Sequence, residues 1–87
     1  MFDKLIIKYI NNLTETDINK FAIDNNIVLS NNEINTVYMA IKNDWKTLLY
    51  GDYKIVLNKY KNNLTASNLE KIEKLIILYK DKYSSYL

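Results

Sequence analysis

The sequence predicts an all-α fold, a compact bundle of four to five short helices in which residues 1–87 form a single domain. Apolar residues recur at helical spacing along the chain, and the alternating pattern of a half-buried strand is missing. Signatures of helix starts occur three times. With 87 residues, 48% of them hydrophobic and 25% charged, the chain has the composition of one small globular domain and no length for a second.

Polar caps have to mark the helix boundaries, because the chain has one Gly and no Pro. In each start signature a Ser or Thr follows a Leu, a side-chain acceptor stands three positions later, and Ile or Leu comes next. These signatures cover residues 13–18, 29–34 and 64–69. The hydroxyl can accept the N–H of the third helical residue. We expect a full capping box only at Ser30 with Glu33, because Thr14 is paired with the shorter Asp17.

The first helix is predicted from a stripe of apolar residues, and the end of the second helix is predicted from a pair of Asn residues. A helix over residues 2–12 is predicted from an i, i+3, i+4, i+7 pattern whose core face consists of Phe2, Leu5, Ile6, Tyr9, Ile10 and Leu13. The second helix begins near Thr14 and is short, because Asn25 and Asn26 can close it in the left-handed conformation. Residues 27–29 then run extended to the next cap.

The third and fourth helices are separated by the single glycine. A long helix is predicted over residues 30–50, with a break near residues 43–44 and its end at Gly51. Asp52 caps a fourth helix, whose apolar stripe continues to Leu64.

The fifth helix begins near residue 65, where Thr65 and Ser67 compete as the cap, and its stripe runs from Leu69 to Tyr86. Short turns join all five helices, so neighbours lie antiparallel or cross at a steep angle. The uneven spacing of the cap signatures argues against a solenoid repeat.

The composition excludes several chemistries. Without Cys or His there is no thiol nucleophile, imidazole base, disulfide or ordinary zinc site, and one Gly makes no phosphate-binding loop. Glu70 and Glu73 share a helical face but have no second catalytic group beside them. We therefore expect no enzyme, no catalytic residues, no cofactor, no metal and no small-molecule substrate.

The sequence also indicates where the protein comes from and where it acts. The longest apolar run, residues 75–79, is far shorter than the ~20 residues that span a bilayer, so we expect no membrane partner and a cytoplasmic location. The preference for Lys over Arg and for Asn over Gln favours codons rich in A and T, which is typical of a low-GC bacterium.

Basic charge is concentrated in the C-terminal half. Residues 1–44 hold four Lys and six acids, whereas residues 45–87 hold eight Lys and four acids. Lysines on the polar faces of the last two helices could contact phosphates, and the candidates are Lys54, Lys61, Lys71 and Lys74. The competing interpretation is that they solubilise an amphipathic surface, and the lack of Arg favours it. A helix-turn-helix is disfavoured because Asn32 and Asn35 would stand at packing positions.

Aromatic and surplus apolar residues point to a protein partner. The stripes hold five of the eight Tyr, which we expect to be half-buried: Tyr9, Tyr38, Tyr53, Tyr60 and Tyr79. The remaining aromatic positions predict a partner surface formed by Trp45, Leu49, Tyr50, Tyr83 and Tyr86. Aliphatic residues outside the stripes indicate either helices buried on two sides or a homodimer interface: Ile7, Ile23, Ile55, Leu75 and Ile77.

Residues 13–18, residues 27–30, Glu33 and residues 37–42 together resemble the small uncharacterised YqfT-like family of Firmicutes. The resemblance extends over about residues 5–80 and implies a similar order of capped helices. This chain departs from the family in having more Tyr and Asn. The resemblance implies no activity and identifies no functional residue.

Three functional hypotheses follow from the sequence. The leading one is a non-catalytic helical protein–protein interaction module that binds another protein or itself, because the chain carries surplus apolar and aromatic residues and no catalytic constellation. The alternative is an RNA- or DNA-binding accessory protein that uses the lysines of the C-terminal half. A phage or mobile-element inhibitor protein fits the small size and the lack of catalytic groups equally well.

Overall fold

A computed structural model describes residues 2–83 of the chain, and within these residues it is built from helices and contains no strand. The elements are α1 (Phe2–Asn12), α2 (Glu15–Asp24), α3 (Asn31–Tyr50), α4 (Tyr53–Tyr60), the 3-10 turn η1 (Lys61–Asn63) and α5 (Ala66–Tyr83). The predicted all-α bundle is therefore confirmed. No helix in the described part of the chain is both long enough and apolar enough to cross a membrane.

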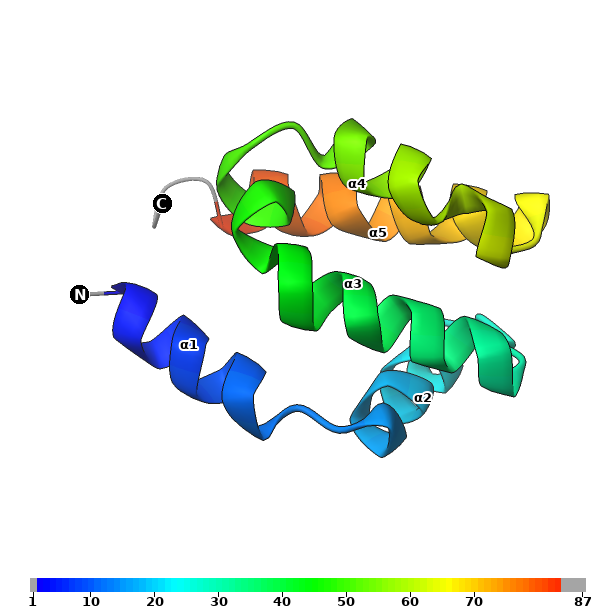
Figure 1. Ribbon diagram of the computed structural model, residues 1–87, viewed down its shortest axis with the longest axis horizontal. Coiled ribbons are helices and arrows are strands. Elements are labelled where there is room, and N and C mark those ends of the chain that lie inside the picture. Colours follow the sequence, from blue (N-terminus) through cyan, green and yellow to red (C-terminus); the bar gives the residue numbers. More distant parts are fainter. Residues whose placement is uncertain (1, 84–87) are drawn as a thin grey trace.

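Helix α3 runs through the middle of the molecule and separates two groups of helices (Figure 1). It packs against α1 and α2 on one side and against α4 and η1 on the other, while α5 lies beside α4. The best-covered apolar side chains belong to α1, α2, the α2–α3 connection and α4: Ile10, Leu13, Ile18, Ala22, Ile27 and Val56. No described side chain is completely shielded from solvent, so the core is modest.

The start of α2 corrects one sequence expectation. Thr14 Oγ1 accepts the backbone N–H of Asp17 at 3.2 Å, and Asp17 Oδ2 accepts the backbone N–H of Thr14 at 3.0 Å. This is a full capping box, so the expectation of one at Ser30 alone was wrong. The carboxylate of Asp17 is shorter than that of Glu, but it still reaches the backbone N–H of Thr14 because Thr14 has an extended backbone conformation.

The end of α2 confirms the predicted Asn turn. Asn26 adopts the left-handed conformation with φ 61°. Its N–H donates to the carbonyl of Ile23 at 3.0 Å, and the N–H of Ile27 donates to the carbonyl of Ala22 at 2.8 Å. This is the hydrogen-bond pattern of a Schellman motif, and the buried Ala22 and Ile27 supply its apolar contact. The chain is thereby turned back toward α3.

The predicted break in the third helix is present. Asp44 lies inside α3 with φ −126° and ψ 19°, outside the helical region, so the helix kinks there. The helix ends at Tyr50, and the N–H of Gly51 donates to the carbonyl of Thr47 at 3.0 Å. A Cβ at Gly51 would approach both the Cα and the carbonyl oxygen of Thr47 to 3.3 Å. Glycine is therefore favoured at this position by close packing.

One buried carboxylate joins the starts of two helices. Glu33 is 5% exposed, and its Oε1 accepts the N–H of Ser30, the cap residue of α3, at 3.0 Å. Its Oε2 accepts the N–H of Thr65, which precedes α5, at 3.0 Å. The side-chain amide of Asn68 donates to both oxygens at 3.1 and 3.0 Å and to the carbonyl of Val28 at 2.9 Å. We call Ser30, Glu33, Thr65 and Asn68 the Glu33 clamp.

The clamp resolves the ambiguity at the start of α5. Thr65 Oγ1 accepts the N–H of Asn68 at 3.1 Å, which makes Thr65 rather than Ser67 the capping residue. The third start signature anticipates Asn68 as an acceptor for the cap. Instead Asn68 donates, and Glu33 from α3 takes the place of the acceptor. A carboxylate remote in sequence therefore completes the cap of α5.

The hydrogen bonds of the clamp dominate the titration of Glu33. Burial by itself raises the pKa of a carboxyl group, but the donors from Ser30, Thr65 and Asn68 outweigh it and lower the pKa of Glu33 from 4.5 to about 2. The folded state thus binds the Glu33 proton less tightly than the unfolded chain. The resulting stability is fully present above pH 4.5 and is lost as the pH falls toward 2.

We predict that Glu33 contributes about 3 kcal/mol to the change in unfolding free energy between pH 7 and pH 2. Urea unfolding followed by far-UV circular dichroism at several pH values measures this change. The Glu33→Gln variant should be less stable at pH 7 and should lack this component of the acid dependence.

The matched control is Glu70→Gln, because Glu70 is exposed on α5 and forms an exposed ion pair with Lys74. Its acid dependence should follow that of the parent chain. If Glu33→Gln and the parent chain lost equal stability between pH 7 and pH 2, the role given to the clamp would be wrong.

Candidate functional site

The described helices surround an apolar hollow of about 390 Å³. It lies between α2, α3, α4 and α5, and its walls include Val37 and Ala40 of α3, Val56 of α4, and Ile72 and Ile76 of α5. Protein interiors are normally packed with few voids larger than one water molecule, whose share of liquid volume is about 30 Å³. The hollow is therefore an opening of ligand or side-chain size, for which the sequence gives no direct signal.

Three polar side chains of the hollow wall are engaged within the chain. Thr36 Oγ1 donates to a carbonyl of the preceding turn at 2.8 Å. The hydroxyl of Tyr60 donates to Asp44 at 2.9 Å, and the ammonium of Lys80 donates to the carbonyl of Gly51 at 2.9 Å. These bonds direct the polar atoms toward the protein, so the wall offers an occupant mainly hydrocarbon contact.

Three aromatic side chains, Tyr9, Phe21 and Tyr79, form what we call the mouth of the hollow. The rings of Phe21 and Tyr79 lie 5.7 Å apart with a tilt of 45°, and Phe21 is 45% exposed. A shallower depression between α1 and α2 shares Tyr9 and Phe21 and is edged by Asp17, Lys20 and Asp24. The mouth is therefore apolar, and the charges around it are of both signs.

Helix α1 leaves part of its apolar stripe uncovered, contrary to the sequence expectation. Ile10 and Leu13 are buried as predicted, but Leu5 is 67% exposed and Tyr9 is 68% exposed. The buried contacts of α1 lie near its C-terminal end, where its last turn also receives a hydrogen bond from Lys42 of α3. We call Leu5 and Tyr9 the open face of α1, and Tyr9 joins this face to the mouth.

The partner surface predicted around Trp45 is only partly exposed. Trp45 and Leu49 are half-buried, and Leu49 lines the hollow. Tyr50 is 47% exposed, and its ring lies edge-on to that of Trp45 at 6.4 Å. The side chain of Tyr83 and all of Tyr86 lie outside the described residues. The exposed apolar surface at the mouth and on α1 replaces this patch as the better candidate.

The aliphatic residues outside the stripes are mostly exposed, as the interpretation of a homodimer interface requires. Ile7 and Ile77 are each 42% exposed, Ile23 is 59% exposed and Ile55 is 64% exposed, while Leu75 is half-buried in the hollow wall. The helices that carry these residues are therefore not buried on two sides. The sequence indicates the surplus of apolar residues but gives no signal that Phe21 lies at the mouth.

The four lysines proposed for nucleic-acid contact are all exposed. Lys54 lies on α4, Lys61 begins η1, and Lys71 and Lys74 lie on α5. Lys74 pairs with Glu70 at 3.4 Å, an ordinary pair one helical turn apart. These positions are typical of solvated lysines on amphipathic helices.

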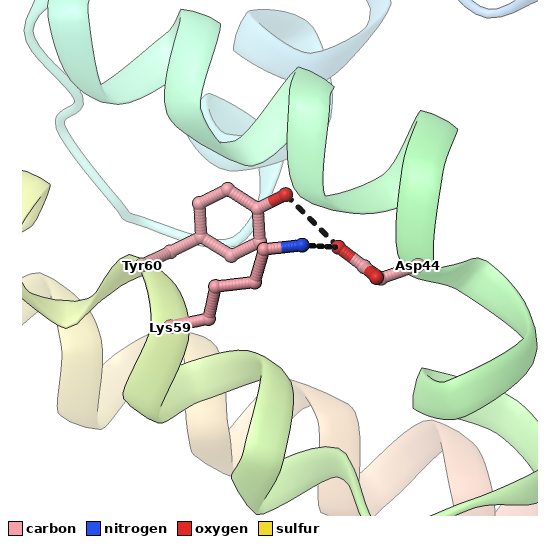
Figure 2. Close-up of polar contacts among 3 residues, drawn as sticks. All are labelled: Asp44, Lys59 and Tyr60. Carbon is pink, nitrogen blue, oxygen red and sulfur yellow. Dashed lines mark hydrogen bonds and ion pairs between the residues drawn. The ribbon is translucent and has the colours of Figure 1, made fainter.

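An ionic cluster stabilises the kink of α3 (Figure 2). Asp44 Oδ2 accepts from the ammonium of Lys59 at 3.3 Å and from the hydroxyl of Tyr60 at 2.9 Å. The hydrogen bond to Asp44 and its negative charge raise the pKa of Lys59 above its ordinary value. Since the cluster ties α4 to α3 and faces no cavity of its own, we interpret it as structural.

The acidic residues Glu70 and Glu73 of α5 do not line the hollow. Glu70 pairs with Lys74 and Glu73 is half-buried, without a second functional group between them. Across residues 2–83 the structure contains no group of three or more acidic, His or Cys side chains placed to hold a metal ion. The hollow and its mouth are the features that could bind another molecule.

We predict that Tyr60→Phe destabilises the fold by about 1.5 kcal/mol, because it removes a hydroxyl that donates to a partly buried carboxylate. Lys59→Met should have a smaller effect, since the ion pair of Lys59 is more than half exposed. Tyr53→Phe is the matched control, because the ring of Tyr53 lies under the ammonium of Lys80 and keeps that contact. Urea unfolding measures all three, and equal effects of Tyr60→Phe and Tyr53→Phe would contradict the assignment.

No protein-family model matches the chain, and no curated protein or solved structure shows significant similarity to it. The resemblance to the YqfT-like family therefore stays a prediction.

Proposed function

We propose that this protein is a non-catalytic interaction module and that its first partner is a second copy of itself. The observation that carries the proposal is the uncovered apolar surface formed by Leu5, Tyr9 and Phe21, which runs from α1 to the mouth of the hollow. Large apolar side chains that lie together at a surface mark sites of association in soluble proteins. A helix laid against this surface would cover the stripe that α1 leaves open.

The charges around this surface favour a second copy as the occupant. The edge carries two acids, Asp17 and Asp24, and one base, Lys20. Two copies related by a twofold axis present the same surface to each other, so a single-sign edge would repel its copy. An edge with charges of both signs can pair acids with bases across the axis.

Each chain supplies both halves of such a contact. Helix α1 is an amphipathic helix with Leu5 and Tyr9 uncovered, and the mouth beside it is apolar. In a twofold arrangement the open face of one α1 packs against the corresponding surface of the other copy. The contact then buries aromatic residues at its centre and charged residues at its edge, as protein interfaces commonly do.

We expect the protein to be dimeric at micromolar concentration in size-exclusion chromatography with light scattering and in sedimentation equilibrium. Tyr9→Lys should raise the dimer dissociation constant about 100-fold, because both copies lose a buried ring and gain a like charge. Circular dichroism checks that the variant stays helical.

The matched control is Ile55→Lys, since Ile55 is 64% exposed on α4, away from this surface. It should leave the dimer unchanged. A parent chain that stays monomeric at high micromolar concentration would overturn self-association and leave a different protein as the occupant. Equal dissociation by Ile55→Lys and Tyr9→Lys would exclude the α1 surface.

A further inference from the structure

We propose that the hollow between α2, α3, α4 and α5 is a binding site for an uncharged, hydrocarbon-rich small molecule. The proposal rests on the interior of the hollow, whereas self-association rests on α1 and the mouth, so either can fail without the other. It also departs from the sequence expectation that the protein has no small-molecule ligand.

The size of the hollow fits such a ligand. Its volume of about 390 Å³ lies within the range of about 300–1,000 Å³ that is usual for small-molecule pockets. Most of the aliphatic side chains around it are only half-buried, including Val37, Ile41, Ile72 and Ile76. A bound hydrocarbon would cover these side chains and remove their remaining apolar surface from water.

The chemistry of the wall selects an apolar ligand. Water inside a cavity is held by two to four polar partners, and Thr36, Tyr60 and Lys80 already direct their polar groups to acceptors in the chain. A ligand with buried polar groups would leave them without partners at a cost in affinity. A hydrocarbon has no polar groups that need hydrogen-bond partners.

Helix α5, which forms one wall of the hollow, is fixed at both of its ends. The entrance between these ends is open. The Glu33 clamp fixes the start of α5, and Lys80 near its end donates to the carbonyl of Gly51 and lies over the ring of Tyr53. Between these ties the ring of Tyr79 contacts that of Phe21, which is 45% exposed. The mouth is therefore the entry path in a chain that is not dimerised, and both ends of α5 beside it are anchored.

The test uses the neutral fluorophore N-phenyl-1-naphthylamine as the probe and Ala40→Leu as the filling variant. Ala40 lines the hollow from α3, and Leu there extends a hydrocarbon side chain into the space that the ligand would occupy. We expect saturable binding of one probe per chain to the parent protein. Ala40→Leu should weaken it about tenfold or more and raise the thermal unfolding midpoint, since it fills an existing space without overpacking.

The matched control is Asn35→Leu, which adds a similar side chain at an exposed position of the same helix and should bind the probe like the parent chain. Leu5→Lys changes the open face of α1 at a position that does not line the hollow, so it should also retain binding, which separates the hollow from the dimer surface. If Ala40→Leu does not fold, Ala40→Met takes its place, because its flexible side chain adapts to the space. Absence of saturable binding, or binding that neither filling variant weakens, overturns the proposal.

Discussion

The position of α5 depends on one buried carboxylate. Glu33 accepts hydrogen bonds from the starts of both α3 and α5, and Asn68 joins its two oxygens to the connection that follows α2. A buried carboxylate is costly unless its oxygens have donors, and each charged hydrogen bond contributes about 1.5–3 kcal/mol when it is satisfied. Helix α5 packs on α4, and it is joined to the first half of the chain by this carboxylate and by the ring contact of Tyr79 with Phe21.

Local signals predicted most of the fold. Capping residues and the Asn turn were readable because their hydrogen bonds join residues close together in the chain, and residues 43–44 marked the kink by their residue types. The predictions were wrong where the burial of a side chain depends on elements distant in the chain. A helical stripe states which side chains share a face, but whether another helix reaches that face depends on packing, so Leu5 and Tyr9 were wrongly assigned to the core.

The candidate site was predictable only as a surplus of apolar residues. The sequence indicates more large aliphatic and aromatic side chains than a two-layer bundle can cover, and the structure distributes them between a half-filled interior and an exposed face of α1. Neither Phe21 nor the hollow has a sequence signature, because a cavity results from the angles between helices. Glu33 was identified as a cap of its own helix, while its second role requires a contact with residues more than 30 positions later.

The shared carboxylate also bears on how the chain folds. The N–H of Thr65 finds its acceptor only when α3 is already formed and correctly oriented, whereas the bonds from Asn68 to Thr65 Oγ1 and from Leu69 to the Thr65 carbonyl are local to α5. Closing the loop of 32 residues between Glu33 and Thr65 is therefore part of making the last helix. A small domain gains cooperativity in this way, because loss of either helix start removes the hydrogen bonds that join the two.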